Sequence, residues 1–219
     1  MKFIDIARQA RRLVRNHTHV TRGIKNRILY GKGAPAFAQL YYVNPKDVKL
    51  VQKKKVFYRK YSLSGMIMGG DWDLQTYPVN ELEKYHICRK HFVDGLSWEE
   101  AGAYDNMARA FKKKPDPDGC RTWDDVRIRF EKLDELFERV KKDRRLLTKK
   151  EINGKKAMRE KGGIYMHFNR NGQPVFSRGG SHRFSIALIL GFEIIPVQVG
   201  VIHKDGIDQF IQKYASNSF

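Results

Sequence analysis

The strongest constraint on the fold lies in the C-terminal part of the chain, where the hydrophobic pattern changes from helical to extended. Residues 163–168 and 173–176 are short apolar runs separated by an Asn-Gly turn, a sequence typical of a β-hairpin. A polar loop follows, then an apolar helical stretch over about 181–190 that Gly191 ends, and then an extended run over 194–201. This order predicts a mixed α/β arrangement in which sheet and helix share one core.

The loop before the predicted helix gathers groups that bind phosphate. The first amides of a helix have no partner within it and carry partial positive charge, and two glycines let an anion approach the backbone. A hydroxyl, an imidazole and two guanidinium groups add further donors. We therefore predict a polyphosphate site, in which Ser181 and His182 are also candidate catalytic residues. Its residues are Arg178, Gly179, Gly180, Ser181, His182 and Arg183.

The same segment resembles the ParB/sulfiredoxin superfamily. In that family a strand leads to a (D/G)-G-x-H-R loop, a helix with a small residue, and a G-x-x-x-I-P-V strand. The resemblance implies a nucleotide-binding core built from residues 35–77 and 163–205, with 78–162 as a helical insertion and 206–219 as a C-terminal tail. The matching residues here are Gly179, Gly180, Ser181, His182, Arg183, Ala187, Gly191, Ile195, Pro196 and Val197.

The resemblance implies ATP or CTP as cofactor and several activities. Family members phosphorylate cysteine sulfinic acid with ATP, phosphorylate free serine, or clamp onto DNA in a CTP-dependent manner. Sulfiredoxins carry Cys where Ser181 stands, and ParB proteins carry Arg-Arg in place of His182-Arg183. The His-Arg form is closer to the kinase-like branch, which includes proteins that pair a GGDWD-type motif with this fold.

Phosphoryl transfer also needs carboxylates, and the sequence Gly-Gly-Asp-Trp-Asp at 69–73 offers two. In an extended segment Asp71 and Asp73 face the same side, with Trp72 on the other. Paired carboxylates suit Mg²⁺, and either one could instead accept a proton from an acceptor hydroxyl. We expect Asp71 and Asp73 to be metal-binding or catalytic; a tight turn with a buried tryptophan is the structural alternative.

Charge indicates an anionic partner. The 219 residues include 43 Lys and Arg against 24 Asp and Glu, a formal net charge of +19. Residues 2–15 have apolar side chains at helical spacing with arginines opposite, which predicts a basic amphipathic helix within a 1–34 arm. This helix could pack on the protein itself, lie on an anionic membrane through residues 1–32, or lie along nucleic acid phosphates.

Residues 78–160 have a helical pattern, with capping-box sequences at Ser97 and Thr148 and a helix cap at Thr122. Cys88 and Cys120 show no metal spacing and are expected to be reduced thiols of a cytoplasmic protein, one that could be peripheral on the inner membrane surface.

The leading prediction is thus a magnesium- and nucleotide-dependent kinase-like phosphotransferase acting on an unidentified hydroxyl or anionic acceptor. A ParB-like nucleotide-dependent nucleic-acid-binding protein and a non-catalytic basic module on an anionic membrane are the alternatives. The sequence leaves the oligomeric state open.

Overall fold

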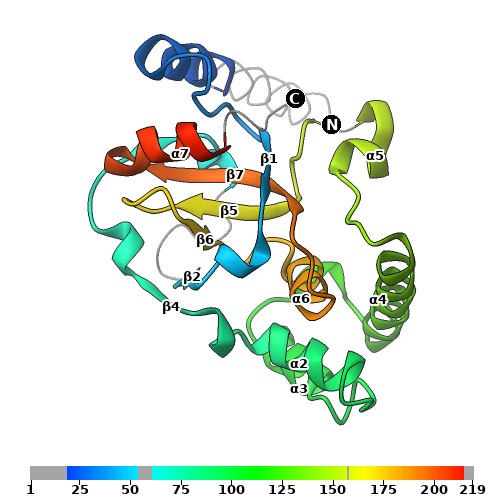
Figure 1. Cartoon of the computed structure of the whole chain (residues 1–219). Coiled ribbons are helices and arrows are strands. Elements are labelled where there is room, and N and C mark those ends of the chain that lie inside the picture. The colour runs from blue at the N-terminus through cyan, green and yellow to red at the C-terminus, as the bar shows by residue number, and fades with distance from the viewer. Residues whose placement is uncertain (1–18, 54–60, 157, 215–219) are drawn as a thin grey trace, which may run out of the picture.

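A computed structural model describes residues 19–53, 61–156 and 158–214 of the chain, so the helix expected over 2–15 lies outside them. The protein has a mixed α/β fold built on a seven-stranded mixed sheet (Figure 1). Residues 19–30 are helical. The strands are β1 (Leu40–Val43), β2 (Leu50–Gln52), β3 (Ile67–Met68), β4 (Thr76–Pro78), β5 (Ile164–Phe168), β6 (Pro174–Phe176) and β7 (Ile195–His203). The later helices are α2 (Glu83–Phe92), α3 (Ala103–Phe111), α4 (Trp123–Asp143), α5 (Lys149–Asn153), α6 (Ser181–Ile189) and α7 (Ile207–Tyr214).

The strand order is β1-β7-β5-β6-β2-β4, with the short β3 pairing with the C-terminal end of β7. β5 and β7 are parallel, whereas β5 and β6 form the expected antiparallel hairpin. The side chain of Asn169 shapes the hairpin turn, because its Oδ1 accepts hydrogen bonds from the amides of Asn171 and Gln173 at 3.0 and 2.9 Å. The hairpin, α6 and β7 thus follow in the predicted order.

All five residues of β5 are buried, so both faces of the sheet are covered at this strand. Ile164, Met166 and Phe168 belong to the main apolar core, to which α6, α7 and the C-terminal half of α4 also contribute. Tyr165 and His167 alternate with them and pack instead against the segment before β4. There the ring of Tyr165 lies 4.9 Å from that of Tyr61, and the ring of His167 lies 5.6 Å from that of Trp72.

The predicted helical insertion has a small core of its own, formed by α2, α3 and the N-terminal half of α4. Both cysteines are buried in it and free, as expected, and burial raises the pKa of the Cys88 thiol to about 12. Thr122 and Thr148 make the predicted caps, each accepting a hydrogen bond from the third amide of its helix. The Ser97–Glu100 capping box also forms, but it closes a turn, and α3 begins only at Ala103.

Three segments differ from the sequence expectations. The sequence of the basic run at 45–55 predicts a short helix or turn; a turn of 3₁₀ helix forms over Pro45–Asp47, but strand β2 follows it, and its Gln52 pairs with Thr76 of β4. The Asp-Trp-Asp motif is a turn of 3₁₀ helix over Trp72–Leu74 and is not extended, so that expectation is wrong. The expected C-terminal tail contains α7, which is not a tail because Phe210 packs into the main core 5.0 Å from the ring of Tyr41.

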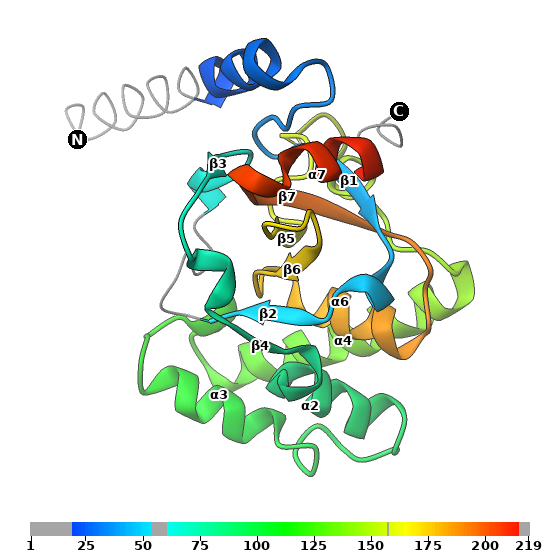
Figure 2. The ribbon, with the colours of Figure 1, turned by 60° about the vertical axis from the view of Figure 1, so that its left-hand side comes forward.

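The helical residues 19–30 lie at one end of the sheet, and α2 and α3 lie at the other (Figures 1 and 2). Polar contacts attach the 19–30 helix to the loops beneath it: Asn26 donates to the carbonyls of Pro35 and Gly65 at 2.7 and 2.8 Å, and Arg22 donates to that of Ser64 at 2.8 Å. Within the described residues, no helix combines the length and the apolar character needed to cross a bilayer.

A substitution at Gly200 would test the packing between β5 and β7. A Cβ at this position would lie 2.2 Å from Nδ1 of His167 and 2.7 Å from the carbonyl oxygen of Met166. Because the neighbours are a buried ring and backbone, Gly200→Ala should lower the free energy of unfolding by about 2–4 kcal/mol. Gly69→Ala is the matched control, since a Cβ there meets nothing within 4 Å. Urea titration of both variants measures this, and equal stability of the two would contradict the packing described.

Candidate functional site

The loop before α6 is held against the start of β5. The carbonyl of Gly179 accepts a hydrogen bond from the amide of Tyr165 at 3.1 Å, and the first helical bond runs from the amide of Phe184 to the carbonyl of Gly180. The amides of residues 181–183 precede that bond, so they have no acceptor within the helix. Arg178 has a positive φ of 64°, and this non-glycine residue in the left-handed region turns the chain into the helix.

Both glycines of the loop are required by packing. A Cβ on Gly179 would lie 2.7 Å from Cβ of Tyr165 and 2.8 Å from the hydroxyl of Tyr61. A Cβ on Gly180, where φ is +70°, would lie 3.0 Å from Cα of Ile164. The structure therefore explains the Gly-Gly pair by close approach to β5, whereas the sequence suggested close approach of an anion.

The polar side chains of the loop diverge. Ser181 is buried, and its hydroxyl donates to the carbonyl of Arg178 at 2.8 Å. The guanidinium of Arg178 donates to the hydroxyl of Tyr77 on β4 at 3.0 Å. Arg183 instead donates to the carbonyl of Leu147, shortly before α5. The expected gathering of two guanidinium groups, a hydroxyl and an imidazole in one small volume is therefore not what the structure places here.

Arg183 is an internal group. Burial lowers the pKa of its guanidinium, and the negative charge of Glu160 opposes that effect. Glu160 is itself buried, and burial raises the pKa of its carboxyl against the hydrogen bond from the amide of Lys149. Arg183 thus ties α6 to the segment around α5, and its replacement would disturb the fold as well as any ligand.

His182 contacts an arginine of the helical insertion. Its Nδ1 lies 3.3 Å from Nη2 of Arg129 on α4, and since arginine can only donate, this nitrogen of the imidazole is the acceptor. Arg129 also donates to the carbonyl of Asp118 at 3.2 Å and lies 3.7 Å from its carboxylate. Lys84 on α2 binds the same carboxylate. We call Lys84, Asp118, Arg129 and His182 the α6 cluster.

Asp118 has an unusual backbone. Its φ is +52°, in the left-handed region that non-glycine residues rarely enter, and Gly119 follows with a φ of +86°. Such a conformation costs free energy and is held in place by surrounding contacts, here the ones that Lys84 and Arg129 make. The loop therefore presents one carboxylate to two cations at the place where the insertion meets α6.

Asp71 and Asp73 bind one arginine. Asp73 is almost fully buried and accepts hydrogen bonds from the backbone amide, Nε and Nη2 of Arg170 at 3.1, 2.9 and 2.8 Å. The exposed Asp71 accepts from the same Nη2 at 2.9 Å. Burial raises the pKa of the Asp73 carboxyl, but the bonds from Arg170 outweigh it and leave that pKa below its usual value. Both carboxylates therefore reach the same guanidinium, although the segment is not extended, and they neutralise it.

This arrangement does not fit a magnesium site, because Arg170 occupies the oxygens that a cation would need. His203 adds no ligand there, since its Nε2 donates to the carbonyl of Gly70 at 2.8 Å. In the part of the chain that the structure describes, no three His, Cys, Asp or Glu side chains group as metal ligands.

The two predicted motifs lie at opposite ends of β5. The Gly-Gly loop packs on Ile164 and Tyr165 at its start, whereas Arg170, which holds the two aspartates, follows its end. The extended chain from position 165 to the end of β5 at Phe168 spans about 10 Å, and Arg170 lies beyond it in the hairpin turn. Asp71 and Asp73 therefore do not join residues 178–183 in one catalytic site.

The residues that contact these two motifs could not be identified from the sequence. Arg129 and His182 are 53 positions apart, and Asp73 and Arg170 are 97 apart, so no local spacing signals either contact. Asp118 links a lysine of α2 to an arginine of α4, and this link arises only because α2 and α4 pack on one another in the insertion. Fold topology, more than motif spacing, brings these residues together.

We expect substitutions of Asp71 and Asp73 to change the free energy of unfolding by different amounts. Asp73→Asn should cost roughly 2 kcal/mol of unfolding free energy at neutral pH, because it removes the buried partner of Arg170. Asp71→Asn should cost less than about 0.5 kcal/mol, since that carboxylate is exposed. The pKa of folded Asp73 is lowered, so its contribution is present above the ordinary carboxyl pKa and is lost as pH falls through the folded value.

Urea titrations at neutral and acidic pH measure this. The gap between wild type and Asp73→Asn should shrink as the pH falls below about 4. A gap that widens in acid would show that the carboxyl of Asp73 is not stabilised as an anion.

Comparison of the chain with known proteins gives no similarity to report: no family model, curated protein or solved structure matches it.

Proposed function

We propose that this protein is a nucleotide-dependent phosphotransferase with a ParB/sulfiredoxin-like core, which binds nucleotide phosphates at the first turn of α6. The observation that carries the proposal is the contact between Arg129 and His182 at that turn. It brings a guanidinium and an imidazole beside amides that the helix leaves without acceptors. The order of hairpin, Gly-Gly loop, α6 and β7 supports the family assignment, because it is the order that the resemblance implies.

The charge balance at the α6 cluster favours an anion. Lys84 and Arg129 supply two positive charges against the single carboxylate of Asp118, and the dipole of α6 adds partial positive charge at Ser181. Arg129 suits phosphate because its planar donors can contact two oxygens at once. ATP or CTP would place its terminal phosphates here.

For the transfer step we assign the proton acceptor to Asp118 in place of Asp71 and Asp73. The hydroxyl oxygen of the acceptor forms a bond to the terminal phosphorus, and the bond from that phosphorus to the bridging oxygen breaks. The nucleoside diphosphate leaves, and the hydroxyl proton passes to the carboxylate of Asp118. Asp118 is the carboxylate that contacts Arg129, and Arg129 would contact the transferred group.

A second candidate is a nucleotide-dependent nucleic-acid-binding protein, which the formal charge of +19 favours. Its affinity for DNA would fall steeply with salt, and nucleotide would change it. Salt-sensitive DNA binding that responds to nucleotide, without any turnover, would support this candidate over the phosphotransferase.

Binding is tested by thermal shift with the magnesium complexes of ATP, CTP, GTP and ADP. A ligand that binds only the folded state raises its melting temperature. His182→Ala and Arg129→Gln should each weaken binding about tenfold, the effect of losing one hydrogen bond to a charged group. Arg139→Gln is the control for Arg129→Gln: it removes the same charge from an exposed position of α4. A wild-type protein that no nucleotide stabilises would overturn the proposal.

Turnover is tested separately with Asp118→Asn, since asparagine tolerates the left-handed backbone at this position. Transfer of the terminal phosphate to water provides a readout that needs no knowledge of the acceptor. The variant should lose roughly 100-fold or more in rate while it keeps nucleotide affinity. Unchanged turnover in Asp118→Asn would remove this residue from the mechanism and leave the binding proposal standing.

A further inference from the structure

The helical residues 19–30 face the solvent with apolar side chains. Val20, Ile24 and Ile28 are 62%, 57% and 78% exposed, and Leu29 is 59% exposed. The spacing of four residues places Val20, Ile24 and Ile28 along one side of the helix, over about 12 Å. The polar residues Arg22 and Asn26 make the contacts with the body of the protein. A helix on a soluble surface ordinarily shows the opposite arrangement.

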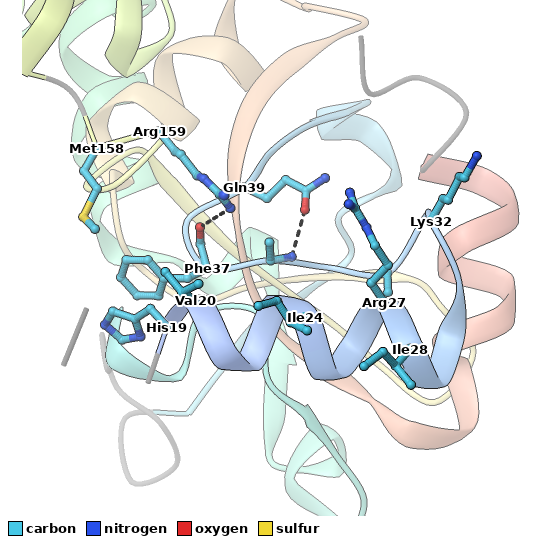
Figure 3. A pocket seen from close by; sticks show the side chains of 13 residues that line it. His19, Val20, Ile24, Arg27, Ile28, Lys32, Phe37, Gln39, Met158 and Arg159 are labelled. Atoms are coloured by element: carbon cyan, nitrogen blue, oxygen red, sulfur yellow. Dashed lines mark hydrogen bonds between the residues drawn. The ribbon is translucent and has the colours of Figure 1, made fainter. Parts of the chain in front are cut away.

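A cavity of about 710 Å³ adjoins this stripe. Figure 3 shows Met158 and Arg159 opposite the helix, with Phe37 beside Val20. Phe37 is fixed there by His19, whose ring stacks on it at 3.5 Å, and by Arg159, which donates to its carbonyl at 3.1 Å. The cavity is therefore a groove with an apolar wall from the helix and a firmly held floor.

Among the residues that the structure describes, the charged side chains that line this groove are all cationic. They are Arg27, Lys32 and Arg159, and Lys25 is exposed on the same helix. The sequence contains no Asp or Glu between positions 19 and 46. The partner must accordingly offer apolar surface and negative charge in one plane, which is the chemistry of an anionic lipid bilayer. A nucleic acid would leave the isoleucines in water, and a neutral apolar partner would leave the cations unpaired.

We propose that the groove face, defined as Val20, Ile24 and Ile28 with Arg27, Lys32 and Arg159, docks the protein on an anionic bilayer. The isoleucines enter the boundary between headgroups and acyl chains, while the cations stay at the headgroup phosphates. This proposal is independent of the nucleotide site. The 19–30 helix lies at the end of the sheet opposite α2 and α3, so docking leaves those two helices away from the membrane (Figure 2).

The test is flotation of the full-length protein with vesicles of phosphatidylcholine, with and without phosphatidylglycerol. Wild type should float only with phosphatidylglycerol. Replacing Ile24 and Ile28 together by Glu should lower binding about tenfold or more, because it removes the inserted groups and repels the headgroups. The matched control, Val93→Glu with Ile128→Glu, makes the same charge change at exposed apolar positions of the insertion and should bind as wild type does.

A second readout does not depend on the stability of that double variant. Ile28→Cys can be labelled with an environment-sensitive fluorophore, because Cys88 and Cys120 are buried. The emission should shift to the blue with phosphatidylglycerol vesicles, and the same label on Val93→Cys should not shift. Arg27→Gln with Lys32→Gln should weaken binding without changing the label's behaviour once bound.

Several outcomes would overturn the proposal. They are no flotation of wild type, flotation of the Ile24 and Ile28 double variant at the wild-type level, and an unshifted Ile28 label. If duplex DNA binding, and not vesicle binding, is lost in the double variant, the face belongs to nucleic acid. If a wild-type dimer becomes a monomer in that variant while vesicles are ignored, the face is an interface between two copies of this chain.

Discussion

Strand β5 is buried along its whole length, and the rest of the structure is arranged to cover its two faces. One face receives α6, α7 and the end of α4, and the other receives the segment that carries Tyr61 and Trp72. β7 must approach β5 so closely that only glycine fits at position 200, beside the ring of His167. Burial lowers the pKa of His167 to about 3, so this imidazole is a neutral packing group.

The same strand separates the two sites that the sequence suggested would combine. Its start holds the loop before α6, and the turn after its end holds Arg170 with Asp71 and Asp73. The aspartates thus secure the turn of the hairpin, a structural task. Chemistry at the other end depends on what the helical insertion brings to α6, namely Arg129, Asp118 and Lys84. The insertion is therefore part of the nucleotide site that we propose.

Local patterns predicted much of the fold. The Asn-Gly turn, the caps at Thr122 and Thr148 and the period of the hydrophobic residues gave the hairpin, α4, α5 and α6, because these depend on neighbours in sequence. β2 was missed because it is only three residues long, between Lys49 and Lys53, and its partners β4 and β6 come from distant segments. α7 was missed because its burial depends on Tyr41 and Phe168, which are far away in the chain.

The candidate site was harder to predict than the fold. The residues of the Gly-Gly loop were identified correctly as a unit before a helix, yet their side chains point to three different elements. The sequence shows which hydrogen-bond donors are present at 178–183. The directions of the Arg178 and Arg183 side chains, however, are set by their bonds to Tyr77 and Leu147. The pairing of His182 with Arg129 required the packing of α4 against α6, which no spacing encodes.

The central claim is that nucleotide phosphates bind at the first turn of α6. The most direct measurement is a titration of isotope-labelled protein with ATP and CTP, followed by the amide resonances of Ser181, His182 and Arg183. The account predicts saturable shifts of these amides, with the side-chain resonances of Arg129 moving at the same nucleotide concentration. Shifts confined to residues 69–73 and Arg170, or no shifts at all, would contradict it.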